Sequence, residues 1–69
     1  MNPIREKMIA ALIQHAEGQI AKHKINVEVY LNNPVGIGEH PDIMEAIERE
    51  LGQMAHYHDQ LEVIGTYIQ

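Results

Sequence analysis

The chain has 69 residues, no cysteine and a formal net charge of −5. Its length indicates one small domain (1–69), and the absence of cysteine excludes disulfides and thiolate metal sites. A core of this size rarely supplies more than about 3–5 kcal/mol of folding free energy. Because disulfides are excluded, oligomerisation is the simplest way to add stability, and we expect a homo-oligomer, most simply a dimer.

The charge is distributed unevenly along the chain. Residues 1–32 contain four basic and three acidic residues, whereas residues 33–69 contain one basic and seven acidic residues. The second half would repel a phosphate backbone, so we expect no direct binding of nucleic acid. An acidic surface that imitates nucleic acid and binds a basic partner is an alternative that the composition leaves open.

The N-terminal sequence, Met-Asn-Pro-Ile-Arg-Glu-Lys, lacks the apolar core of a secretory signal. No apolar run approaches the length that crosses a membrane. We therefore expect a cytoplasmic protein without membrane association.

The first predicted element is a helix over about 3–32. Asn2 is a suitable N-cap, and Pro3 suits the first helical position, where no backbone N–H is needed. Apolar or near-apolar residues then recur in alternating steps of four and three, which is typical of a coiled-coil seam. The members of this seam are Ile9, Ile13, Ala16, Ile20, His23, Val27 and Tyr30.

The end of this segment has a second interpretation. Ile25, Val27, Val29 and Leu31 also alternate with period two in a β-branched run. This alternation is typical of a short strand, so the local pattern leaves helix and strand open for residues 25–31.

A loop is predicted over about 33–40, where Asn, Pro and Gly are concentrated. Val35 and Ile37 alternate with glycines in this loop. We expect these two side chains to provide an apolar contact surface at the closed end of the molecule.

The second predicted helix covers about 41–67, with Pro41 as its first residue. Asp42 and Glu45 lie near its N-terminus, where the helix dipole favours negative charge. An apolar pattern in steps of three and four again indicates a coiled-coil seam. Its members are Met44, Ile47, Leu51, Met54, His58, Leu61, Gly65 and Ile68.

The two seams fit a single antiparallel hairpin. Their members pair symmetrically about Ile37, so that Val27 faces Ile47 and Ile13 faces Leu61. Since the two patterns meet in one register around the predicted loop, we predict an all-α antiparallel two-helix hairpin, and the register favours a helix over 25–31.

One flank of this hairpin is predicted to stay exposed and apolar. It contains Leu12 from the first helix and Ile43, Tyr57 and Ile64 from the second. Two hairpins that bury these flanks against each other would form an antiparallel four-helix bundle. We expect these four residues to form the interface.

Catalytic chemistry has little support in the sequence. There is no serine or cysteine, and Thr66 is the only aliphatic hydroxyl, so Ser-His and Cys-His nucleophiles are excluded. The carboxylates lie on a polar helix face with nothing apolar around them to raise a pKa. We expect neither enzymatic activity nor a cofactor.

Five histidines are the one enrichment that suggests a site. Helical metal sites place His or carboxylate ligands three or four residues apart, and the nearest combination is His15, His58 and Glu62. We expect His23 and His58 to be ordinary half-buried seam residues. A metal site at the three candidate ligands, or a pH switch at the seam histidines, is the alternative.

Residues 27–43 read Val-Glu-Val-Tyr-Leu-Asn-Asn-Pro-Val-Gly-Ile-Gly-Glu-His-Pro-Asp-Ile. This block resembles a segment of short uncharacterised proteins of marine bacteriophages, and the similarity extends over most of the chain. The resemblance implies no known activity and carries over no functional residue. It implies a prokaryotic or phage-infected cytoplasm and a small accessory protein that acts by binding.

These patterns predict a helical hairpin that dimerises into a four-helix bundle and serves in protein–protein interaction or as a structural accessory protein. Two alternatives from other classes are a His/carboxylate metal-binding bundle and an acidic nucleic-acid mimic.

Overall fold

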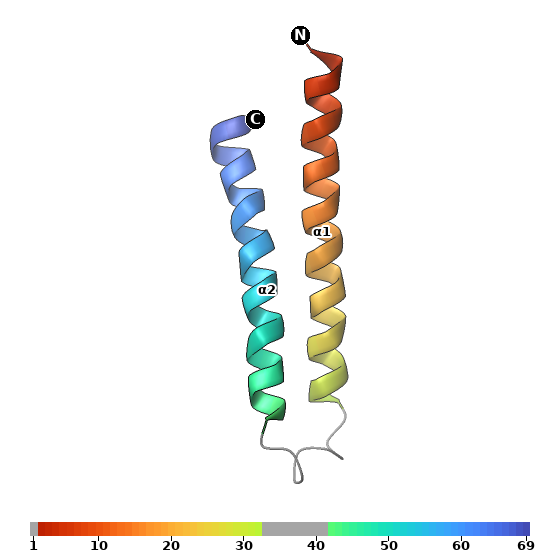
Figure 1. Cartoon of the computed structure of the whole chain (residues 1–69), viewed down its shortest axis with the longest axis vertical. Coiled ribbons are helices and arrows are strands. Elements are labelled where there is room, and N and C mark those ends of the chain that lie inside the picture. Colours follow the sequence, from red (N-terminus) through yellow and green to blue (C-terminus); the bar gives the residue numbers. More distant parts are fainter. Residues whose placement is uncertain (1, 33–41) are drawn as a thin grey trace.

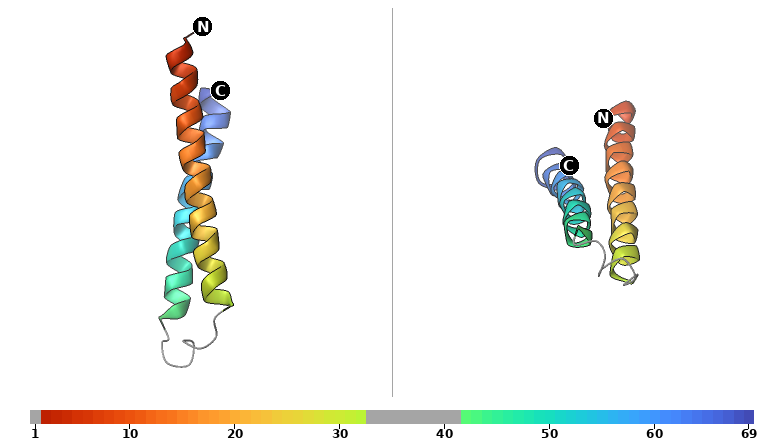
Figure 2. Two further views of the ribbon diagram at one scale, coloured as in Figure 1. Left: turned by 90° about the vertical axis from the view of Figure 1, so that its right-hand side faces the viewer. Right: turned by 60° about the horizontal axis from the view of Figure 1, so that its bottom comes forward.

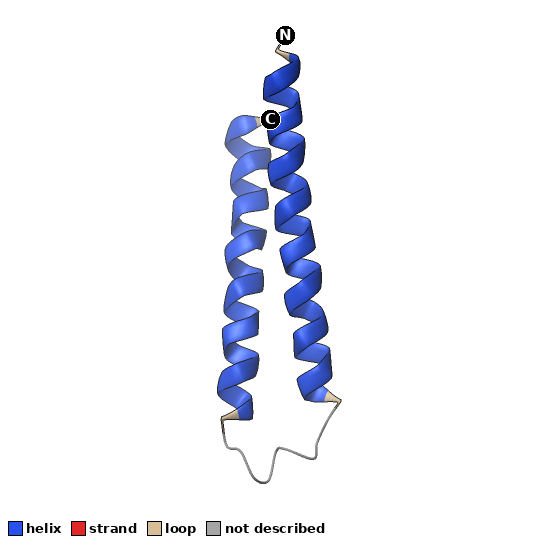
Figure 3. Ribbon diagram, turned by 45° about the vertical axis from the view of Figure 1, so that its right-hand side comes forward, coloured by secondary structure: helices blue, strands red, loops and turns tan. Residues whose placement is uncertain are grey.

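The computed structural model describes residues 2–32 and 42–69, which form two long antiparallel helices lying side by side (Figure 1). All regular structure in these two ranges is helical (Figure 3). A perpendicular view shows the helices crossing at a shallow angle (Figure 2), as coiled-coil pairs do. The all-α hairpin predicted from the sequence is therefore confirmed.

Helix α1 covers Pro3–Leu31. The side-chain oxygen of Asn2 accepts hydrogen bonds from the backbone N–H groups of Ile4 at 3.0 Å and Arg5 at 3.3 Å. These two N–H groups belong to the first helical turn, where backbone N–H groups have no hydrogen-bond partner within the helix. Asn2 is therefore the N-cap that the sequence predicts.

The segment from residue 25 to 31 is helical and not a strand. Val27 and Tyr30 are half-buried in phase with Ile20 and buried His23, so the helix extends the seam by two more positions. Asn32 then closes α1, because its backbone N–H donates to the Glu28 carbonyl at 3.0 Å and its side-chain amide donates to the same oxygen at 2.7 Å.

Helix α2 covers Ile43–Val63 and passes into a π-helical turn, η2, at Ile64–Ile68. The helix begins two residues after the predicted start at Pro41, which lies outside the described residues together with the predicted loop over 33–40. The backbone N–H of Gln69 donates to the Ile64 carbonyl at 2.9 Å. This five-residue spacing defines a π-helix.

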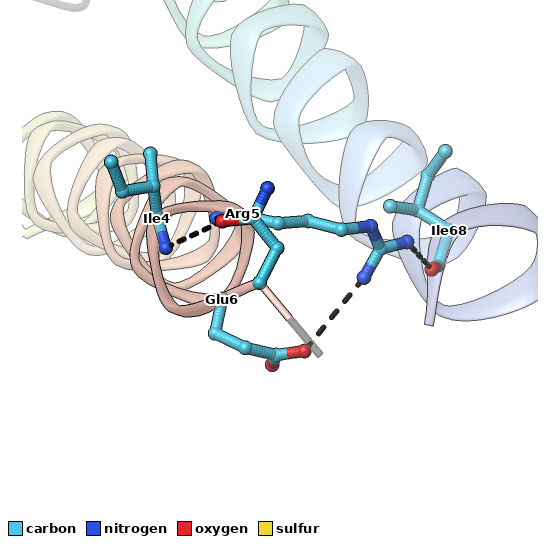
Figure 4. Close-up of polar contacts among 5 residues, drawn as sticks. Ile4, Arg5, Glu6 and Ile68 are labelled. Carbon is cyan, nitrogen blue, oxygen red and sulfur yellow. Dashed lines mark hydrogen bonds and ion pairs between the residues drawn. The ribbon is translucent and has the colours of Figure 1, made fainter.

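The two ends of the chain are tied together by Arg5. Its Nη2 donates to the carbonyl oxygen of Ile68 at 2.8 Å, and its Nη1 lies 3.8 Å from the carboxylate of Glu6 (Figure 4). The free carbonyls of a helix end accept such donors readily, so this contact holds η2 against the first turns of α1.

The seam predicted for α1 is confirmed at every position. Ile9 and Ala16 are buried, with 7% and 0% of their surface exposed, and His23 is buried beside them. The remaining members are half-buried: Ile13, Ile20, Val27 and Tyr30.

The seam predicted for α2 is wrong at five of its eight positions. Ile47, Met54 and Leu61 are half-buried as expected, but Leu51 is 49% exposed and the His58 side chain is 68% exposed. Met44, Gly65 and Ile68 are exposed as well. At four of these five places a half-buried residue lies one position earlier in the sequence: Ile43, Glu50, Tyr57 and Ile64.

The volume of the apolar side chains turned inward explains why α2 is rotated by one residue relative to the predicted seam. Turning the helix by one residue brings Tyr57 and Ile64 inward in place of His58 and Gly65. These two exchanges add an aromatic ring and a branched aliphatic chain to the contact. The same rotation turns Leu51 outward and Glu50 inward, where His23 and Asn26 bind the Glu50 carboxylate.

The hairpin is long and thin. Its Cα atoms span 56 × 16 × 12 Å with a radius of gyration of 16.1 Å, whereas a compact domain of this length has a radius of about 11 Å. The accessible surface is 5450 Å², against about 4400 Å² for a typical folded monomer of this mass. About 1000 Å² per chain is therefore exposed in excess of the usual amount.

Candidate functional site

A polar cluster lies in the middle of the contact between α1 and α2. His23 Nδ1 and Glu50 Oε2 are 3.1 Å apart, and the side-chain amide of Asn26 donates to the other carboxylate oxygen, Oε1. The side chains of His23 and Glu50 are only 11% and 17% exposed. One carboxylate therefore satisfies two polar residues of the opposite helix, as a buried polar group requires.

The hydrogen bonds around Glu50 hold the pKa of its carboxyl group below the ordinary value. The Asn26 amide is the largest cause, because it donates to the ionised form, and His23 and Lys22 act in the same direction. Partial burial opposes them by disfavouring the charge. Glu50 is therefore an ionised acceptor at neutral pH.

Only one of the four residues expected on the exposed apolar flank is exposed. Leu12 is 57% exposed, whereas Ile43, Tyr57 and Ile64 are half-buried in the inner face of α2. The ring of Tyr57 meets that of His15 edge-on, with centroids 5.7 Å apart. The expectation that this flank stays open to solvent is corrected by the rotation of α2, since most of its apolar surface is already used within the hairpin.

What is left of this flank is an open groove between α1 and the end of α2. It has a volume of about 370 Å³. The groove is lined by Leu12, His56, Asp59, Gln60, Val63 and Ile64. The other two predicted interface residues, Val35 and Ile37, lie outside the described residues.

The three candidate metal ligands do not form a three-ligand group. His58 Nε2 and Glu62 Oε1 lie 3.2 Å apart on the outside of α2, but His15 packs against Tyr57. Within residues 2–32 and 42–69 no group of three or more His, Asp or Glu side chains is arranged to hold a metal ion.

One exposed surface of α1 with apolar side chains was not predicted from the sequence. On a side of α1 largely turned away from α2, residues again recur in alternating steps of four and three, although one of them, His15, still reaches the ring of Tyr57 on α2. We call this set the outer stripe, and all of its members are exposed: Ile4, Met8, Ala11, His15, Gly18, Lys22, Ile25 and Val29. The signal was present as a second heptad pattern in the same helix, offset from the inner seam.

The outer stripe is apolar at both ends and small in the middle. Ile4, Met8 and Ile25 are each at least 62% exposed, and Val29 is 56% exposed. A Cβ atom added at Gly18 would meet no side chain of the described residues within 4 Å. α1 therefore has a second face with heptad spacing, of which the hairpin uses only His15, in its edge-on contact with Tyr57.

The outside of α2 differs in character, because its exposed residues include Glu45, Glu48, Asp59 and Glu62. Arg49 is the one basic residue within α2. Acidic residues are therefore concentrated on the outside of α2, beside exposed Met44 and Leu51.

Neither described helix combines the length and hydropathy needed to cross a membrane. Comparisons with protein-family models, curated proteins and solved structures give no match for this chain.

Proposed function

We propose that this chain is a protein–protein interaction module that acts by self-association, with two hairpins joining to form a four-helix bundle. The observation that carries the proposal is that α1 has exposed apolar side chains at both ends of the outer stripe, which α2 leaves largely uncovered. Exposed apolar patches of this kind commonly mark protein interfaces.

The size of the hairpin core supports the same proposal. Among the described residues, Ile9 and Ala16 are the only buried apolar side chains, while eleven large apolar residues are exposed. Soluble monomers rarely leave contiguous apolar patches uncovered, and such patches commonly mark protein interfaces. A second copy would supply the missing cover and the missing stability.

We propose the cytoplasm as the setting. In such an assembly the acidic face of α2 stays available to a basic partner, which is the alternative role that the composition leaves open. The proposed self-association needs no such partner.

Light scattering on a sizing column tests the proposal. At neutral pH we expect a mass of twice the 7.9 kDa chain, together with a melting temperature that rises with protein concentration, because association stabilises the folded state. A mass of one chain at every concentration, with an unchanging melting temperature, would contradict self-association.

A further inference from the structure

We infer that the outer stripe of α1 is where the second copy binds, with the two α1 helices packed antiparallel about a two-fold axis. This inference rests on the self-association proposed above and specifies its geometry. α1 would then form the centre of the bundle, with α2 of each hairpin on the outside.

The outer stripe has the length and spacing of a helix-packing seam. From Ile4 to Val29 it runs for about 37 Å at 1.5 Å per residue. The alternating steps of four and three keep it in line along a supercoiled pair. The stripe lies on the side of α1 opposite buried Ile9 and Ala16, so the same helix can pack on α2 and on a second α1.

Side-chain sizes along the stripe favour an antiparallel pair. In that orientation Ile4 meets Val29 of the second copy, and Met8 meets Ile25. In the middle, Lys22 meets Ala11, and Gly18 leaves room opposite His15, whose ring stays against Tyr57 of its own hairpin. A parallel pair would instead bring the two Lys22 ammonium groups together in the seam, which costs like-charge repulsion.

The charges beside the stripe are also complementary in the antiparallel orientation. Lys7 and Glu28 lie on the same side of the stripe near opposite ends of α1, and both are exposed. Within the described residues neither forms an ion pair. The two-fold axis would place Lys7 of each copy beside Glu28 of the other, and such flanking pairs set helix orientation in coiled coils.

The exposed area fits this assignment. Each chain exposes about 1000 Å² more than a typical monomer of its mass, and a stable interface buries about 800 Å² per partner. A second copy on the outer stripe would therefore bring the surface of each chain close to the normal range.

Two methionines provide a matched test. Met8 lies on the outer stripe and is 62% exposed, while Met44 lies on α2 and is 65% exposed. Glutamine has a similar length and helix propensity but is polar. We expect Met8→Gln to raise the dimer dissociation constant at least tenfold, since each dimer loses two apolar side chains, and Met44→Gln to change it less than twofold. Sedimentation equilibrium measures both constants.

The outcomes separate the inference from the proposed function. If the wild-type chain dimerises and Met44→Gln weakens the dimer as much as Met8→Gln, self-association stands and the outer stripe is overturned as its surface. If the wild-type chain is monomeric at all concentrations, both proposals fail.

A charge exchange tests the orientation. Lys7→Glu and Glu28→Lys should each weaken the homodimer roughly threefold or more, because each places like charges together twice. Mixing the two variants should restore a dimer of wild-type affinity, since both flanking pairs become attractive in the mixed species. Weakening by the single variants without recovery on mixing would overturn the antiparallel arrangement.

Discussion

Glu50 is the only acidic side chain of the described residues that is not exposed. It lies on the inward face of α2, whose other residues are apolar. His23 and Asn26 of α1 each contact one of its two carboxylate oxygens. Replacing all three residues by apolar ones could leave stability unchanged. The three residues fix the register of the two helices, because sliding either helix by one turn would leave a buried carboxylate without its partners.

The lowered pKa of Glu50 makes stability depend on pH. In the unfolded chain its carboxyl group titrates at about pH 4.3. The ionised group therefore stabilises the fold above about pH 5, and this contribution is lost as the pH falls through the lower native pKa.

We expect the melting temperature of the wild-type chain to fall more steeply below about pH 5 than that of Glu50→Gln, measured by circular dichroism at fixed protein concentration. Glu48→Gln, at an exposed position of the same helix, should keep the wild-type slope. Parallel curves for all three proteins would show that Glu50 does not have the predicted role.

Ala16 is completely buried, so the space at this point of the helix pair admits only a methyl group. We expect Ala16→Leu to lower the free energy of unfolding by about 1–3 kcal/mol through overpacking. Ala55→Leu, at an exposed site on α2, should change it by less than about 0.5 kcal/mol. Urea denaturation compares the two, and equal effects would mean that the helices do not pack closely at Ala16.

At the scale of the element, every position of the inner seam of α1 could be predicted from the sequence. The apolar or near-apolar residues of this seam recur in unbroken steps of four and three. The phase of α2 was ambiguous. Two heptad frames differing by one residue share Ile47, Met54 and Leu61, and the sequence analysis chose the frame without a charge. The structure adopts the frame with Glu50, since Asn26 and His23 can satisfy that charge.

The outer stripe and the polar cluster could not be recognised until α1 was oriented. A second apolar stripe indicates a free packing surface only when the first is known to pack against α2. Asn26 and Glu50 lie 24 residues apart in sequence, and their contact depends on α2 turning Glu50 inward.

Helix propensity gives a prediction at this scale. Gly18 and Gly52 lie in the interiors of α1 and α2, where an added Cβ atom meets no side chain of the described residues within 4 Å. We expect Gly18→Ala and Gly52→Ala each to raise the free energy of unfolding of the monomer by about 0.5–1 kcal/mol, measured by urea denaturation at low protein concentration. Destabilisation by either would indicate close approach of another part of the chain.

For the whole molecule, the elongated shape follows from there being only two helices, which share one line of contact. Longer helices would not cover their other sides, so the outer stripe of α1 stays exposed. Antiparallel pairing of two outer stripes closes that face with the residues already present.

Cross-linking with single cysteines tests this arrangement most directly, because the natural chain has no cysteine. Ile4→Cys and Val29→Cys would place each thiol near one end of the outer stripe. In an antiparallel dimer, identical thiols lie about 37 Å apart, far beyond the reach of a disulfide, whereas the two different thiols lie opposite each other. We predict that neither variant forms a disulfide-linked dimer alone in a thiol–disulfide buffer and that the mixture forms one readily. Linked dimers from each variant alone, or no linkage in the mixture, would contradict the antiparallel pairing.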